Sequence, residues 1–283
     1  MFAVLLALGS ALSWGTGDFI SGLMSRRVAL LSVLVLSQGA GLPLMALVAL
    51  LRGDLPQDFS FVPYAALASL FGQIGLASLF RGMAVGTISI VAPISATGAA
   101  IPVMVGLATG EQPTPLQGAG IMLAIVGVML ASRDPDDTRS SFVVRPSSSS
   151  GLPYALLAAL GFGLFYVTLG YAGRVDAVWA VLVQRAVSLP LLLAAVAVAR
   201  PNLAVGWHSA GVLVIAGALD AAANVLYAAA NAAGLGGLAA VLASVYPVIT
   251  VALAAGFLRE RLAPWQWAGV ASALAGIALI ALR

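Results

Sequence analysis

The chain has 283 residues, of which 61% are hydrophobic and only 8% are charged, with a formal net charge of +3. Because a soluble domain carries about 25% charged residues, this composition argues against a water-soluble globular protein and predicts a surface that faces lipid. The basic residues are all Arg and form no basic run with interleaved aromatics, and there is one His and no Cys, so we expect no nucleic-acid partner, no metal, no cofactor and no disulfide.

Ten apolar stretches follow one another along the chain, each about 17–25 residues long and therefore able to cross a bilayer as a helix. The first continues past residue 20, which is too long for a signal peptide and predicts a retained helix. Ala and Leu dominate and no run alternates polar with apolar residues, so strands are not expected. The predicted helices are 2–24, 29–51, 62–82, 86–108, 115–132, 152–172, 177–199, 209–231, 235–257 and 264–282.

The longest polar interval, residues 133–151, is rich in Ser, Pro and Asp and predicts a linker between segments 1–132 and 152–283. Identities at a constant spacing indicate that the two segments are repeats of each other. Weaker echoes pair Trp14-Gly15 with Phe162-Gly163 and Leu42-Pro43-Leu44 with Leu189-Pro190-Leu191. The main series is Glu111, Pro115, Gln117, Ala119, Gly120, Ala124, Gly127 and Leu130, which recurs as Glu260, Pro264, Gln266, Ala268, Gly269, Ala273, Gly276 and Leu279.

Each repeat is predicted to cross the membrane an odd number of times, so the second repeat enters from the opposite side. We therefore predict an all-α integral membrane protein of ten transmembrane helices, arranged as two inverted five-helix repeats around a central cavity. Secondary transporters use this architecture for alternating access. Because both repeats are in one chain, a monomer is sufficient to form the cavity.

The junction between the fourth and fifth helices of each repeat resembles the EamA-type family of the drug/metabolite transporter superfamily. The matching residues are Gly110-Glu111 to Pro115 with Gly120 and Gly127, Glu260 to Pro264 with Gly269 and Gly276, and the Trp14-Gly15 pair of the first helix. The resemblance covers nearly all of the chain and implies an exporter of amino acids or other small metabolites. It also implies that the fifth and tenth helices pack against each other at the periphery while the others line the cavity.

Small residues and two glutamates in these segments have a structural interpretation. The stripes Gly120-Ala124-Gly127 and Gly269-Ala273-Gly276 each lie on one helical face and predict close helix packing. Glu111 and Glu260 lie at helix–loop junctions, where capping or interfacial hydrogen bonding is expected of them.

Polar side chains form a stripe on the predicted eighth helix, where Asp220, Asn224, Tyr227 and Asn231 recur at helical spacing. In contact with lipid this stripe would be costly, since one Asp alone costs about 2.5–3.5 kcal/mol on insertion scales. We therefore expect the stripe to face protein or water, either lining the cavity or forming hydrogen bonds to neighbouring helices.

Arg185 on the seventh helix is the other costly residue. A rise of about 1.5 Å per residue places Arg185 about 13 Å and Asp220 about 16 Å from the same membrane surface. Because pairing of opposite charges at similar depth offsets much of the free-energy cost of burying each one, we predict a contact between Arg185 and Asp220, direct or through water. Such a pair either binds substrate or holds the two helices together.

Amide side chains are expected near the same depth as this pair. Gln38, Gln73 and Gln184 all fall near the membrane midplane, and Gln38 aligns with Arg185 when the Leu-Pro-Leu echoes are superposed. Because inverted-repeat transporters bind cargo at the midplane, these amides are candidate cavity residues, although a buried Gln often only bonds a neighbouring helix.

Three aromatic residues, Trp14, Tyr166 and Tyr246, are candidates for shaping the cavity and stacking on aromatic cargo, with packing as the alternative role. Asp18 is expected near the end of the first helix, close to the membrane surface opposite to the one at which this helix starts. It is a candidate carrier of a coupling proton or a partner of Arg26.

These patterns favour a secondary transporter of small metabolites in the cytoplasmic membrane. A cavity with one acid, one base, amides and aromatics suits amino acids with apolar or aromatic side chains, while sugars, nucleosides and drug-like compounds remain alternatives. A channel is disfavoured by the lack of a repeated filter motif, and an intramembrane enzyme by the lack of a nucleophile–base arrangement. The chain contains neither Lys nor a Gly-x-x-x-x-Gly-Lys motif, so ATP coupling within it is not expected.

Arginines are unevenly distributed between the predicted loops of the two sides. With Arg81 and Arg185 set aside as embedded in the membrane, the termini share their side with Arg52, Arg174 and Arg283, so the positive-inside rule places both termini outside, whereas the family resemblance implies both termini inside for many relatives. We prefer the orientation that the charges favour. The arginines of the other side are Arg26, Arg27, Arg133, Arg139, Arg145, Arg200, Arg259 and Arg261.

Overall fold

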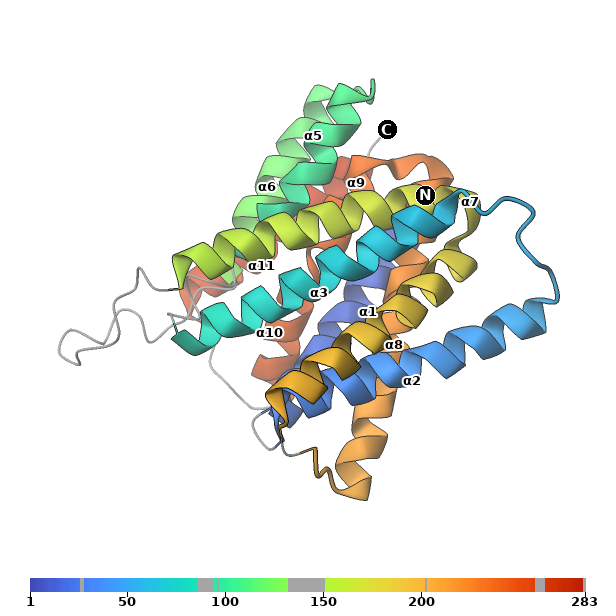
Figure 1. Cartoon of the computed structure of the whole chain (residues 1–283). Helices are drawn as coiled ribbons and strands as arrows, with labels where there is room; N and C mark the ends of the chain where they lie inside the picture. Colours follow the sequence, from blue (N-terminus) through green and yellow to red (C-terminus); the bar gives the residue numbers. More distant parts are fainter. Residues whose placement is uncertain are drawn as a thin grey trace.

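The computed structural model describes residues 1–25, 28–85, 94–95, 97–131, 151–201, 203–257 and 263–281, and all regular secondary structure in these ranges is helical. The predicted linker 133–151 lies outside the described residues except for Gly151, as do Arg26 and Glu260. The helices, shown in Figure 1, are α1 (Phe2–Ser25), α2 (Leu30–Arg52), α3 (Phe61–Val85), η1 (Thr97–Ala99), α5 (Ala100–Ala108), α6 (Pro115–Ala131), α7 (Leu152–Ala199), α8 (Trp207–Ala230), η4 (Asn231–Leu235), α9 (Gly237–Ala243), α10 (Tyr246–Phe257) and α11 (Pro264–Ala281).

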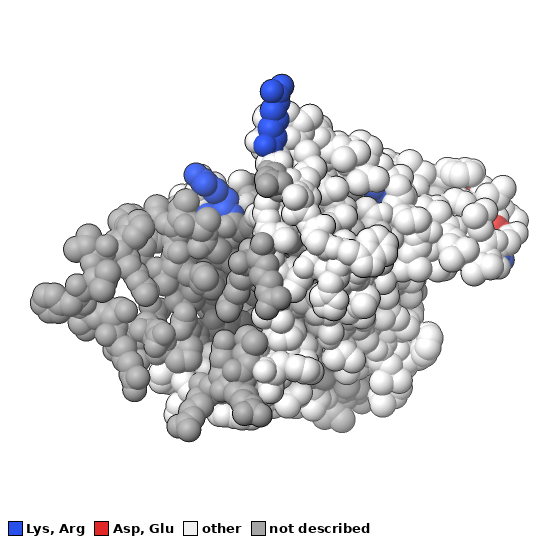
Figure 2. All heavy atoms as spheres, turned by 90° about the horizontal axis from the view of Figure 1, so that it is seen from below, with Lys and Arg blue, Asp and Glu red and all other residues white. Residues whose placement is uncertain are grey.

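Five helical spans in the described ranges are long and apolar enough to cross a membrane, as judged by length and composition: Phe2–Ser21, Leu30–Arg52, Phe61–Leu79, Leu152–Ala199 and Trp207–Leu235. Shorter apolar helices cover Thr97–Ala108, Pro115–Leu130, Gly237–Ile249 and Pro264–Ile280. Large apolar side chains such as Leu50, Trp207 and Phe257 are exposed. Figure 2 shows a face on which uncharged residues cover almost all of the described surface, as expected of a protein surrounded by lipid.

Helix α7 contains both the sixth and the seventh predicted helix. Its backbone leaves helical geometry at Asp176 (φ −157°, ψ 113°), which divides it into a first arm before this residue and a second arm after it. The Asp176 carboxylate accepts hydrogen bonds from the backbone N–H groups of Val178 (2.9 Å) and Trp179 (3.0 Å), so it caps the second arm. The same carboxylate pairs with Arg52 at 2.8 Å, which ties the turn to the end of α2.

Two of the helices predicted for the second half of the chain differ from the observed ones. The prediction of one continuous helix over 235–257 is wrong, because α9 ends at Ala243 and α10 begins at Tyr246, directly before Pro247. The predicted helix 209–231 continues into the π-helical turn η4, which contains Gly234 (φ 93°) and is followed by Gly236 (φ 52°). Only the second part of the predicted helix 86–108 is described, as η1 and α5 together with residues 94–95.

The small-residue stripes of α6 and α11 face each other, which confirms the predicted packing of these two helices. A Cβ atom added at Gly127 would lie 2.7 Å from the carbonyl oxygen of Gly269, and one added at Gly276 would lie 2.6 Å from that of Gly120. The two backbones therefore approach so closely that only glycine fits at the crossing. In the rest of the molecule, the first arm of α7 packs along α3 and α1 packs along α8 (Figure 1).

Candidate functional site

A buried charge cluster joins α2, the second arm of α7 and α8. The Arg185 side chain, only 1% exposed, pairs through Nη2 with Asp220 Oδ2 and donates from Nη1 to Gln38 Oε1. The ring closes because Gln38 Nε2 donates to Asp220 Oδ2 at 3.3 Å. The predicted contact between Arg185 and Asp220 is thus present and direct, and Gln38, predicted near the same depth, completes it.

Helix α1 adds Trp14 to this cluster, since its indole Nε1 donates to Asp220 Oδ1 at 3.1 Å. The long Arg185 side chain reaches the cluster past Gly41, where an added Cβ would lie 3.3 Å from both Arg185 Cδ and Nε. A side chain at position 41 would therefore press on the stem of Arg185. The absence of a side chain at Gly41 is what lets α2 and α7 bring Gln38 and Arg185 together.

Three buried polar atoms at this level have no hydrogen-bond partner among the described residues. They are Arg185 Nε, Gln184 Oε1 and Asn224 Oδ1, on side chains that are 1%, 4% and 2% exposed. A buried unsatisfied polar group carries a desolvation penalty, so such groups in a folded protein need a reason. Asn224 lies one helical turn after Asp220 on the same face of α8, which places its free acceptor beside the charge cluster.

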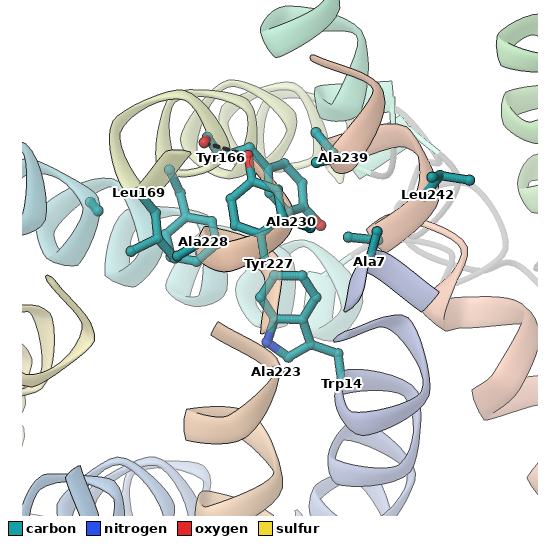
Figure 3. Packing of buried hydrophobic residues seen from close by; sticks show 14 of the residues in the cluster. Ala7, Trp14, Tyr166, Leu169, Ala223, Tyr227, Ala228, Ala230, Ala239 and Leu242 are labelled. Atoms are coloured by element: carbon teal, nitrogen blue, oxygen red, sulfur yellow. Dashed lines mark hydrogen bonds between the residues drawn. The ribbon is translucent and has the colours of Figure 1, made fainter. Parts of the chain in front are cut away.

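An aromatic layer adjoins the charge cluster through the Trp14–Asp220 hydrogen bond, and Figure 3 shows its residues Trp14, Tyr166 and Tyr227. The ring of Trp14 packs 5.8 Å from Tyr166, 6.0 Å from Tyr227 and 6.4 Å from Tyr246, between ring centroids. Tyr227 is completely buried, packs with its ring tilted against that of Tyr166 at 5.1 Å between centroids, and donates its hydroxyl to the Tyr166 carbonyl oxygen at 2.5 Å. The sequence-predicted aromatic residues therefore come together around Trp14 and close the interior at this level.

Asp18 lies on the inward face of α1 even though its side chain is exposed. Gly15 on one flank packs against Tyr246 and Ile249 of α10, and Gly17 on the other flank packs against Ala216 and Leu219 of α8. At 100° per residue, Asp18 and Trp14 fall between these two flanks, so both point between α8 and α10. The Asp18 carboxylate also interacts electrostatically with Asp220. The Asp18 carboxylate therefore lies on the side of α1 that faces α8 and α10, near the charge cluster.

Gln73 does not join the charge cluster, although the sequence placed it at a similar depth. Its Nε2 donates to the Ser188 hydroxyl at 3.3 Å, and that hydroxyl is 2.8 Å from the hydroxyl of Ser69. Ser188 is one helical turn from Gln184 on α7. Gln73 and the two serines thus form a second polar contact, between α3 and α7, beside the first.

The end of the molecule at which α5, the two arms of α7 and η4 meet is closed by a polar network, here called the Glu111 end. Glu111 Oε2 accepts from the backbone N–H of Gly237 at 2.9 Å, which confirms its predicted capping role. Arg174 lies 3.8 Å from Glu111 Oε1 and donates from Nε to Asn231 Oδ1 at 3.1 Å. Asn231 Nδ2 in turn donates to the carbonyl oxygen of Gly236 at 3.2 Å.

Outside this network lies a cavity of about 410 Å³, lined by residues that include Glu111, Gln117, Arg174, Asn231 and Leu238. The sequence did not predict the role of Arg174 or of Gly236. An available signal was the run Gly234-Leu235-Gly236-Gly237, since Gly236 adopts φ 52° and an added Cβ would collide with the Glu111 carboxylate. The described residues contain no group of three or more His, Asp or Glu side chains placed to hold a metal ion.

Comparison with known proteins agrees with this architecture. The model of a family described as "EamA-like transporter family" matches the chain twice, over residues 1–133 and 149–282. One solved crystal structure superposes with a TM-score of 0.76 at 19% sequence identity, covering 99% of this chain and 98% of its own, which shows a shared fold. No curated protein sequence matches the chain.

Proposed function

The chain belongs to the EamA-like transporter family, within the drug/metabolite transporter superfamily, and from this premise we propose that it is a secondary transporter that exports small metabolites by alternating access. Amino acids with apolar or aromatic side chains are the leading substrate class, and sugars, nucleosides and drug-like compounds are the alternatives. The observation that carries the proposal is the Arg185–Asp220–Gln38 cluster. Charged side chains inside apolar membrane helices cost free energy and are rare, and where they occur they usually belong to a binding site or a pathway.

The arrangement of open and closed regions fits alternating access. On one side of the aromatic layer, Asp18 is exposed and Asp220 is partly exposed. On the other side, Glu111, Arg174 and Asn231 line the 410 Å³ cavity. Between these two sides lie the buried Trp14, Tyr166 and Tyr227. An alternating-access carrier needs such a closed layer on one side of its site at any moment.

Two inverted five-helix repeats, 1–132 and 152–283, joined by the linker 133–151, are part of the proposal. Five helical spans in the described ranges are long and apolar enough to cross a membrane; the proposal of ten crossings counts the two arms of α7 separately and takes each of the four shorter apolar helices as one further crossing. The α6–α11 crossing supports a two-fold relation, because Gly127 meets Gly269 while its repeat counterpart Gly276 meets Gly120. Equivalent residues that exchange partners in this way are the mark of an isologous contact.

We place the protein in the bacterial inner membrane with both termini outside, as the distribution of arginines favours. In this orientation the side on which Asp18 is exposed faces the cytoplasm, from which an exporter loads its cargo. The closed Glu111 end then faces outward.

Counterflow in proteoliposomes tests the function. Vesicles preloaded with unlabelled solute are given trace labelled solute from a panel of apolar and aromatic amino acids, phenethylamine, a sugar and a nucleoside. We expect transient accumulation of at least one labelled solute above equilibrium, and its loss in Arg185→Ala and Asp220→Ala. A channel would equilibrate the label without this overshoot, and the absence of any movement across the panel would count against transport.

The Glu111 network should act as the outer gate, which cysteine labelling can test because the chain has no native Cys. Ala230 is completely buried next to Asn231, so we expect Ala230→Cys to react slowly with a maleimide. Adding Glu111→Ala removes the acceptor of the Gly237 N–H and a neighbour of Arg174, and should raise the labelling rate about tenfold.

Gln112→Ala, in the same loop, is the matched control and should leave the rate unchanged. An unchanged rate in the Glu111 variant would refute the gate. An impermeant maleimide added to intact cells tests orientation in the same experiment: labelling in detergent but not in cells would place the Glu111 end in the cytoplasm.

A further inference from the structure

The charged groups that face open space in the central site are its carboxylates and not its arginine. Arg185 is fully buried and its guanidinium is held by Asp220 and Gln38. The Asp220 side chain is instead 27% exposed, and Asp18 is exposed beside it. The side that a cargo molecule meets is therefore acidic.

The net charge of these groups in the central site is also negative. Arg185 and Asp220 form a neutral pair, and Asp18 forms no ion pair with any residue in the described ranges. One negative charge is thus left over at this level among the described residues. A carboxylate on the cargo would meet that charge at short range, where like charges repel strongly in a medium of low dielectric constant.

Hydrogen-bonding capacity agrees with the charge. Among the described residues, Asn224 Oδ1 is a buried acceptor without a hydrogen-bond partner, and Asn224 lies on α8 between Asp220 and Tyr227, which both contact Trp14. An ammonium group offers three N–H donors and no acceptor. The exposed Asp18 and the partly exposed Asp220 carboxylates are complementary acceptors for these donors. The adjacent aromatic layer provides an apolar surface and ring faces that attract cations.

We infer that the central site anchors its cargo by an ammonium group held between Asp18 and Asp220, so that the cargo class is small organic amines with an apolar or aromatic body. A carboxylate on the cargo is not required and weakens binding. This inference rests on the proposed transport function and narrows its substrate class. Arg185 then fixes the position of Asp220 and does not itself bind cargo.

Three ligands with the same phenyl body and different charge test the inference on the purified full-length chain in detergent. They are phenethylamine, a cation; phenylalanine, a zwitterion; and 3-phenylpropionate, an anion. We expect labelled phenethylamine to bind at least about tenfold more tightly than phenylalanine, because only phenylalanine adds a carboxylate that meets the unbalanced negative charge, and we expect 3-phenylpropionate not to compete. This comparison uses the unaltered chain and so does not depend on any variant folding.

Asp18→Asn should weaken phenethylamine binding by about tenfold or more. Asp58→Asn makes the same chemical change at an exposed loop carboxylate that accepts hydrogen bonds from Ser60, and should leave the affinity unchanged. Equal or tighter binding of phenylalanine, or an affinity for phenethylamine that Asp18→Asn leaves unchanged, would overturn the inference.

If counterflow of a zwitterion or a neutral solute were still seen in that case, transport would stand without the ammonium site. Phenethylamine binding without counterflow of any solute would instead refute transport.

Discussion

Replacing Asp220 with asparagine should lower the free energy of unfolding by about 3–5 kcal/mol, because it leaves the buried Arg185 without a counter-charge. Arg185→Met should cost less, because the Asp220 carboxylate is partly exposed and keeps its hydrogen bonds from Trp14 and Gln38. The specific expectation is that Asp220→Asn lowers the free energy of unfolding more than Arg185→Met does. Chemical denaturation of each variant in detergent measures it.

The double variant Arg185→Met with Asp220→Asn removes both charges and should be more stable than Asp220→Asn alone, since interacting residues are not additive. The surface pair Arg52–Asp54 is the control: both side chains are substantially exposed, and Asp54→Asn should cost about 1 kcal/mol or less. Equal losses for Asp220→Asn and Asp54→Asn would mean that the central pair is not a buried one.

The same substitution should have opposite effects at two glycines of α6. At Gly127, a methyl group would meet the backbone of Gly269 and Ala273 on α11, so Gly127→Ala should destabilise the protein by about 1–3 kcal/mol through overpacking. At Gly118 an added Cβ has no neighbour within 4 Å. There the substitution only reduces the freedom of the unfolded chain, so Gly118→Ala should stabilise by about 0.4–1 kcal/mol.

Thermal unfolding of the two variants in detergent, beside the parent chain, checks these signs. Gly276→Ala is expected to repeat the loss at Gly127, because its added Cβ would lie 2.5 Å from the backbone nitrogen of Ala124. A stable Gly127 variant combined with an unstable Gly118 variant would show that α6 presents its other face to α11.

Much of the helical layout was predictable because apolar length and small-residue spacing are local properties of the sequence. The α6–α11 contact followed from two matching stripes, and the Arg185–Asp220 contact followed from matching depth, since burying either charge alone is costly. The break between α9 and α10 was not recognised, because Ser244 and Val245 continue an apolar run and only Pro247 signals the interruption.

The details of the site depended on side-chain direction, which spacing does not determine. Gln38 and Gln73 have the same residue type and a similar predicted depth, yet one bonds Arg185 and the other Ser188. The availability of Arg185 to cargo was also beyond the sequence, because it depends on Gly41 leaving space and on Gln38 taking the second guanidinium nitrogen. The Glu111–Gly237 contact joins residues of different repeats, which no local pattern reveals.

The reciprocal crossing of α6 and α11 has an evolutionary consequence. One ancestral five-helix polypeptide with this surface would have recognised a second copy of itself, turned over in the bilayer, through the same glycines. In such a homodimer every charge would appear twice. Gln38 and Gln73 stand as far apart along the chain as Arg185 and Asp220 do, so the first half carries amides where the second half carries the ion pair. Fusion of the two copies into one gene is what permits a single, unduplicated salt bridge at the centre.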